Sequence, residues 1–128
     1  MKQKTEIMVV DDEPIVCERL QNYLEKKGMS VESFTESQKA LDRLDEKDFD
    51  VIVTDLKMEG PTGMDILSAV KRLDYNAEVI LITAYGKYET MREAEAVGVF
   101  EYIDKPFKMS EIHDLIKKAA KKSKKRSK

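Results

Sequence analysis

Short apolar runs alternate along the chain with stretches whose apolar residues recur every three or four positions. The runs predict five strands, near residues 7–10, 29–34, 51–53, 79–82 and 99–103. The helix-spaced positions predict five helices, over residues 16–24, 40–44, 66–73, 91–97 and 112–120. Pro14 stands where the first helix should begin and Gly28 where it should end, each at the position that favours it.

Five strand–helix alternations in 128 residues predict a single α/β domain. The first, third and fourth runs lack polar alternation, as expected for parallel strands that are covered by helices on both faces. The turn-rich stretch at residues 59–63 must be a loop. Right-handed crossovers leave few possible topologies for such a sheet.

Composition removes several classes of protein. A single cysteine, Cys17, excludes an internal disulfide and a cysteine zinc site, and a single histidine, His113, leaves little for a hydrolase triad. No apolar run approaches the roughly 20 residues that span a membrane. The polar first residues also lack a signal-peptide core. We therefore expect a cytoplasmic protein that does not contact the membrane.

The net charge of −2 conceals an uneven distribution. Residues 117–128 hold eight basic and no acidic residues, whereas residues 1–116 hold 15 basic and 25 acidic residues. The acidic body argues against direct nucleic-acid binding by the domain itself. We expect a folded domain over residues 1–120 and a basic C-terminal tail, or the start of a linker, over residues 121–128.

Polar residues with reactive side chains stand at the ends of the predicted strands. Asp11 and Asp12 follow the first strand, Asp55 the third, Thr83 the fourth and Lys105 the fifth. Ligands of open parallel sheets bind outside the carboxyl ends of the strands, so these side chains meet if the strands are neighbours. Asp12 is also placed to cap the helix that begins at Pro14, which is its plain structural interpretation.

This set of side chains has a chemical logic. Clustered carboxylates repel one another and need a cation, and Mg²⁺ prefers oxygen ligands. A carboxylate beside the metal can attack phosphorus and form an aspartyl phosphate. Asp55 is the preferred nucleophile because it stands alone at the end of its strand, whereas Asp11 and Asp12 suit metal binding. Thr83 and Lys105 can then contact the phosphoryl oxygens.

Nearly the whole chain, from about residue 5 to residue 120, resembles the receiver domain of two-component response regulators. Four motifs carry the resemblance: Val9–Pro14 (VVDDEP), Val53–Met58 (VTDLKM), Ile82–Ala84 (ITA) and Lys105–Phe107 (KPF). The resemblance implies a flavodoxin-like (βα)5 fold, a three-layer sandwich with a parallel sheet of strand order 2-1-3-4-5. It also implies a cis bond between Lys105 and Pro106.

The resemblance further implies a role for each site residue. Asp55 matches the phosphoacceptor, and Thr83 and Lys105 match the residues that bind the phosphoryl group. Asp12, Asp55 and the main-chain carbonyl of Lys57 match direct Mg²⁺ ligands, while Asp11 matches the acid that reaches the ion through water. Thr83 and Tyr102 match the switch pair, which moves inward on phosphorylation.

The loop after Asp55 departs from the commonest family pattern. Glu59 stands where many members have proline, and the proline is displaced to Pro61, while Gly63 keeps its place. Lys57 and Tyr85 occupy positions that tune the lifetime of the phosphoryl group in the family. We expect the site to survive this change and the phosphoryl group to be fairly stable.

The implied function is a phosphorylation-activated signalling switch that takes its phosphoryl group from a sensor histidine kinase or a phosphotransfer protein. Its output is a downstream effector domain or protein, such as a transcription regulator that begins with this receiver, or a homodimer. The switch is not an ordinary enzyme, because it phosphorylates and dephosphorylates only itself. Three alternatives stay open: a Mg²⁺-dependent aspartyl-phosphate phosphatase, a flavodoxin-like cofactor binder, and a receiver-like binding module that is never phosphorylated.

Overall fold

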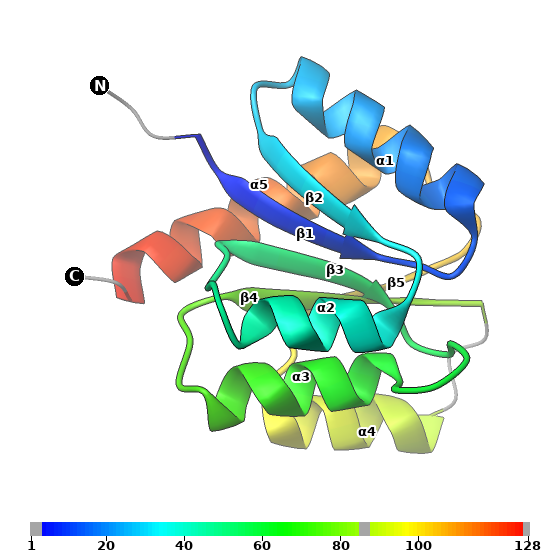
Figure 1. Ribbon diagram of the computed structural model, residues 1–128, viewed down its shortest axis with the longest axis vertical. Helices are drawn as coiled ribbons and strands as arrows, with labels where there is room; N and C mark the ends of the chain where they lie inside the picture. The colour runs from blue at the N-terminus through cyan, green and yellow to red at the C-terminus, as the bar shows by residue number, and fades with distance from the viewer. Residues whose placement is uncertain (1–3, 85–87, 127–128) are drawn as a thin grey trace.

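The structure, a computed structural model, describes residues 4–84 and 88–126 of the chain. Strands and helices alternate throughout, as predicted (Figure 1). In chain order they are β1 (Glu6–Val10), α1 (Pro14–Lys26), β2 (Ser30–Phe34), α2 (Ser37–Leu44), β3 (Val51–Asp55), α3 (Gly63–Arg72), β4 (Glu78–Thr83), α4 (Tyr88–Val97), β5 (Glu101–Asp104) and α5 (Met109–Arg126).

The five strands form one parallel sheet in the order β2-β1-β3-β4-β5. The predicted α/β class and the strand order implied by the family resemblance are both confirmed. The chain moves outward from β1 to β2, then crosses to β3 on the other side of β1. This reversal brings the carboxyl ends of β1 and β3 side by side, which is where an open parallel sheet binds its ligands.

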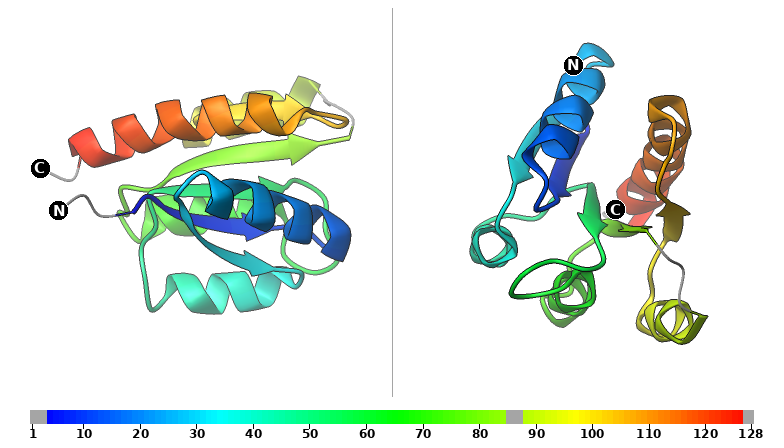
Figure 2. Two further views of the ribbon diagram at one scale, coloured as in Figure 1. Left: turned by 90° about the horizontal axis from the view of Figure 1, so that it is seen from above. Right: turned by 90° about the vertical axis from the view of Figure 1, so that its right-hand side faces the viewer.

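Helices cover both faces of the sheet, with α1 and α5 on one face and α2, α3 and α4 on the other (Figures 1 and 2). Alternate residues of β1 supply the two cores: Ile7 and Val9 belong to one buried cluster, Met8 and Val10 to the other. All four side chains are fully buried. The lack of polar alternation in the first apolar run follows from this arrangement, because neither face of β1 meets water.

The boundaries of α1 follow the proline and glycine signals of the sequence, but its predicted cap does not. Helix α1 begins at Pro14, and Gly28 follows it with φ of +85°, a conformation in which glycine has no side chain to strain. Helix α3 is capped by a reciprocal pair, Thr62 and Asp65. The capping interpretation of Asp12 is wrong, because the N-cap residue of α1 is Glu13 and its side chain makes no capping hydrogen bond.

Helix α5 extends well beyond the apolar stripe that predicted it and ends at Arg126. Ser123 is buried, and Lys124 Nζ lies 3.2 Å from Thr5 Oγ1 beside the start of β1. The basic segment is therefore helical and packed at least as far as Lys124. In the described ranges, no helix combines the length and the apolar character that crossing a membrane requires.

Candidate functional site

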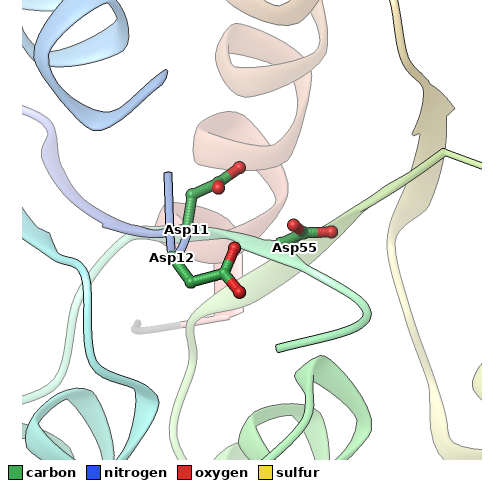
Figure 3. Close-up of side chains that lie close together, drawn as sticks. All are labelled: Asp11, Asp12 and Asp55. Atoms are coloured by element: carbon green, nitrogen blue, oxygen red, sulfur yellow. The ribbon is translucent and has the colours of Figure 1, made fainter. Parts of the chain in front are cut away.

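Three carboxylates meet at the carboxyl edge of the sheet. Asp11 and Asp12 directly follow β1, and Asp55 is the last residue of the neighbouring strand β3 (Figure 3). Each offers an oxygen, and these oxygens all lie within 4.8 Å of one another. The sequence prediction that these three residues converge is confirmed as geometry. An all-oxygen donor set of this kind suits a hard divalent cation.

Asp11 is fully buried, which is unusual for a carboxylate. Its Oδ1 accepts a hydrogen bond of 2.9 Å from the backbone N–H of Glu13. Its Oδ2 is buried and accepts no hydrogen bond within the described part of the chain, although Lys105 Nζ lies 3.2 Å away. A buried oxygen left in this way fits a ligand that the protein chain does not supply, such as a cation or its bound water.

Lys105 provides the positive charge of the site. Its backbone N–H donates to the Thr83 carbonyl at 2.8 Å, which ties the loop after β5 to the end of β4. The peptide bond that follows, Lys105–Pro106, is cis, as the resemblance implied. The ammonium then lies 3.1 Å from Glu13, 3.2 Å from Asp11 and 3.4 Å from Asp55.

The pKa values of Asp11, Asp55 and Lys105 are all raised, by burial or by the neighbouring charges. Burial raises the pKa of Asp11, and the Lys105 ammonium offsets part of that effect. Burial and the Asp11 charge likewise raise the pKa of Asp55. Burial opposes the charge on Lys105, but Glu13, Asp11 and Asp55 outweigh it and raise the pKa of that ammonium. The site as a whole has more negative charge than one lysine can balance.

A polar pocket of about 260 Å³ opens beside Asp55. Its walls include Asp12, Lys57, Thr83, Ala84 and Lys105. Of the predicted site residues that the structure describes, all but Asp11 and Tyr102 line this one pocket, and Asp11 contacts Lys105.

Gly63 brings the start of α3 against the end of β3. A Cβ on this residue would lie 2.6 Å from the Asp55 carbonyl oxygen and 3.0 Å from Leu56 Cα. The departures in the preceding loop are accommodated: Gly60 adopts φ of +82°, and the Glu59 carbonyl accepts a hydrogen bond of 3.3 Å from Ser37 Oγ. Residue 63 therefore lies against the backbone of Asp55 and Leu56, where a side chain larger than that of glycine does not fit.

The predicted switch pair, Thr83 and Tyr102, lies beside α4. The Tyr102 hydroxyl donates a hydrogen bond of 2.9 Å to Glu95 on α4, and this contact raises the pKa of the phenol. Thr83 is buried and lines a small cavity under α4 together with Tyr102. Tyr85, expected to screen the phosphoryl group, lies outside the described residues.

Sequence reasoning did not assign a role to Glu13, whose carboxylate makes the shortest contact with the Lys105 ammonium among the three at the site. The two residues are 92 positions apart, so no local pattern links them. One signal was available: a glutamate occupies the N-cap position of α1, where Ser, Thr, Asp and Asn are preferred.

The sequence model of one protein family, the response regulator receiver domain, matches residues 7–117, so the chain belongs to this family. Members of the family are phosphorylation-activated switches of two-component systems rather than enzymes that turn over a substrate. The resemblance to receiver domains that the four sequence motifs indicated is therefore confirmed.

The chain is similar to proteins of two different lengths. Sporulation initiation phosphotransferase F of Bacillus subtilis is 32% identical over 112 residues, which cover 88% of this chain and 90% of that protein. Transcriptional regulatory protein ZraR of Escherichia coli K12 is 32% identical over 114 residues, but these cover only 26% of it. A receiver domain protein from Clostridium thermocellum, of solved structure, aligns with a TM-score of 0.86 and 31% identity over 94% of this chain and 97% of that one.

Proposed function

We propose that Asp55 accepts a phosphoryl group from a histidine kinase or a phosphotransfer protein, and that phosphorylation changes the protein contacts of the domain. The observation that carries this proposal is the convergence of Asp55 with Asp11, Asp12 and Lys105 at one edge of the sheet, beside a pocket that Thr83 also lines. The predicted nucleophile, metal ligands and phosphoryl partners are thus within reach of one reacting group.

Mg²⁺ is the cofactor that we assign to the carboxylates. Asp12, Asp55 and the main-chain carbonyl of Lys57 would hold the ion, and Asp11 would reach it through a water molecule. The buried Oδ2 of Asp11 accepts no hydrogen bond within the described residues and has the Lys105 ammonium beside it, which supports this assignment, since a metal-bound water would satisfy it. When bound, the ion neutralises the crowded carboxylates and the incoming phosphoryl oxygens.

The transfer itself needs only a few groups of the chain. A carboxylate oxygen of Asp55 attacks phosphorus, and the bond between phosphorus and the imidazole nitrogen of the donor histidine breaks. The Lys105 ammonium and the Thr83 hydroxyl then donate hydrogen bonds to phosphoryl oxygens. Hydrolysis of the resulting acyl phosphate by water, again within this site, returns Asp55 to its carboxylate form.

Thr83 and Tyr102 form the proposed switch. Both line the same small cavity between β4, β5 and α4, so a movement of Thr83 toward a phosphoryl group frees space next to the Tyr102 ring. The ring then turns inward and gives up its hydrogen bond to Glu95. The surface of α4, β5 and α5 is thereby altered, and its affinity for a partner changes with it.

We assign the output of the domain to an effector domain or protein, such as a transcription regulator that this receiver precedes, or to a homodimer of the receiver. The basic segment over residues 121–128, which begins as the last turns of α5, would lead from the domain to such an effector. We place the protein in the cytoplasm, where its kinase and its nucleotide-derived phosphoryl groups are found.

The phosphatase alternative is not supported by the residues at the pocket. Enzymes that hydrolyse phosphate esters through an aspartyl phosphate often need a second acid two positions after the nucleophile, and that position holds Lys57. Lys57 is exposed at the rim of the pocket, where it adds positive charge and no proton-accepting carboxylate.

The proposal is tested by measuring the intact mass of the protein after incubation with acetyl phosphate and Mg²⁺. The parent chain should gain one phosphoryl group, and the gain should disappear with a metal chelator. The Asp55→Asn variant, which keeps the size of the side chain, should gain none. A folded parent that gains no phosphoryl group under these conditions would leave a receiver-shaped binding module instead.

A further inference from the structure

Glu13 occupies a position where its side chain gives its own helix no hydrogen-bonded cap. It is the N-cap residue of α1, with extended backbone angles, and its side chain accepts no hydrogen bond from the first turn. A shorter Ser, Thr, Asp or Asn would cap the helix there. A residue that breaks a local preference without a local gain is often kept for a role elsewhere in the molecule.

The carboxylate of Glu13 is used across the site instead. Its Oε1 lies 3.1 Å from Lys105 Nζ, closer than the oxygens of Asp11 and Asp55 that share the same ammonium. The Glu13 side chain is 59% exposed and that of Lys105 is 21% exposed, so the pair stands at the outer rim. Both residues line the polar pocket beside Asp55 and also the neighbouring groove, of about 620 Å³, next to Phe107.

We infer that Glu13 is a positioning residue that holds the Lys105 ammonium at the rim and competes for it with the phosphoryl group on Asp55. The inference rests on the proposed function of Asp55. It assigns to Glu13 a control over how readily the domain becomes phosphorylated, without any contact between Glu13 and the phosphoryl group itself.

The competition follows from the number of partners around one ammonium. Three carboxylates already surround Lys105, and a phosphoryl group on Asp55 brings further anionic oxygens that need the same donor. Lys105 can turn fully to those oxygens only when its contact with Glu13 is weakened. Removing that contact therefore favours the phosphorylated state over the unphosphorylated one.

Two substitutions separate the contact from the charge. Glu13→Asp keeps the negative charge but draws the carboxylate back by about 1.5 Å, the length of one carbon–carbon bond, out of contact with Lys105. Glu13→Gln removes the charge and keeps the length. Aspartate is a favoured N-cap residue and glutamine matches the size of glutamate, so neither variant threatens the fold.

The test uses two readouts at physiological ionic strength, which screens distant charges. One is the second-order rate constant of phosphorylation by acetyl phosphate with Mg²⁺, and the other is the apparent affinity for beryllofluoride, a tetrahedral anion that mimics a phosphoryl group on a carboxylate. Since partly exposed ion pairs contribute little, both values should rise about twofold to fivefold in Glu13→Asp and at least as much in Glu13→Gln. The same changes at Glu18, an exposed residue on the same helix, should leave both values unchanged.

The outcomes separate this inference from the proposed function. A parent that takes up no phosphoryl group overturns both. A parent that is phosphorylated, with Glu13→Asp identical to it in both readouts, overturns only the competition, because Glu13 would then act at most through its charge. Lower values in both Glu13 variants also overturn it, since Glu13 would then support the ammonium rather than compete for it.

Discussion

Asp11 shows how the site is kept at a cost to stability. Its carboxylate is fully buried, one oxygen accepts the Glu13 N–H, and the other has only the Lys105 ammonium nearby in the described part of the chain. Burial raises its pKa because the charged form is poorly solvated. Such a group destabilises the folded state unless its charge is fully compensated, and the Lys105 ammonium is shared with Glu13 and Asp55.

The substitution Asp11→Asn should therefore stabilise the metal-free protein. The amide oxygen can still accept the Glu13 N–H, while the buried charge and its repulsion of Asp55 are removed. We expect the free energy of unfolding to rise by about 1 kcal/mol, measured by urea unfolding with a chelator present. Asp114→Asn, at an exposed position of α5, serves as the control and should change little.

When Mg²⁺ replaces the chelator, the parent should become more stable to urea than the Asp11→Asn variant. A ligand that binds only the folded state adds stability in proportion to the logarithm of its concentration, and the variant lacks one carboxylate of the site. An Asp11→Asn variant that is less stable than the parent without metal would show that the carboxylate is already satisfied within the chain.

At the scale of elements, the junction between β3 and α3 decides where Asp55 stands. The first residue of α3 is Gly63, and its N–H donates to the Leu56 carbonyl at 2.9 Å. The Asp55 carbonyl oxygen lies where a Cβ of residue 63 would point. The backbone of Asp55, the proposed phosphoacceptor, and the start of α3 thus touch without an intervening side chain.

Gly63→Ala should move this junction and destabilise the fold. The added methyl would meet backbone atoms at 2.6 and 3.0 Å, which cannot rotate away, so we expect a loss of about 2–3 kcal/mol in urea unfolding. Phosphorylation by acetyl phosphate should also slow. Gly28→Ala is the control: it has open space and only the strain of φ at +85°, about 1 kcal/mol. Equal losses of unfolding free energy in the two variants would contradict the expected clash at residue 63.

The free energy of unfolding should depend on pH through His113, which lies where α5 packs on α1. The ring lies edge-on to Tyr23 at 6.0 Å between centroids, and burial together with Lys117 and Lys27 lowers the pKa of the imidazole. The folded protein therefore binds fewer protons at this residue than the unfolded chain does, at pH values between the lowered pKa and the ordinary one. Its stabilising contribution is present above the ordinary pKa and is lost as the pH falls.

His113→Asn removes the titrating group and should flatten the pH dependence of stability below neutral pH. The measurement is urea unfolding of parent and variant between pH 5 and pH 8, where the parent should lose more stability than the variant on acidification. Parallel curves for the two proteins would mean that His113 is protonated equally easily in the folded and unfolded chain.

At the scale of the whole molecule, the charged regions lie at opposite ends of the sheet. The carboxylates stand at the carboxyl ends of the strands, while α5 runs back toward the start of β1, where Lys124 meets Thr5 (Figures 1 and 2). The basic end of α5 therefore cannot compensate the acidic site directly. Lys105 does so, with its Nζ 3.2 Å from Asp11 and 3.4 Å from Asp55.

Much of this arrangement could be predicted from the sequence, because the apolar runs are short and uninterrupted and each ends in a polar residue. Asp11, Asp12, Asp55, Thr83 and Lys105 were all placed correctly at strand ends, since parallel strands share one carboxyl edge. Contacts between side chains that are distant in the sequence could not be predicted in this way. The Glu13–Lys105 and Glu95–Tyr102 contacts depend on how elements pack. The length of α5 was underestimated because its last turns carry no apolar residues: Ser123 is buried there, but lysines surround it in the sequence.

The central claim is that Asp55, and no other group, carries the phosphoryl group. Hydroxylamine attacks the acyl carbon of an aspartyl phosphate and leaves a hydroxamate on that residue, so peptide mass spectrometry after treatment of the phosphorylated chain identifies the acceptor. The account predicts a hydroxamate at Asp55 alone, formed only in samples that received both acetyl phosphate and Mg²⁺. A hydroxamate at Asp11 or Asp12, or a phosphorylated chain that yields none, would contradict it.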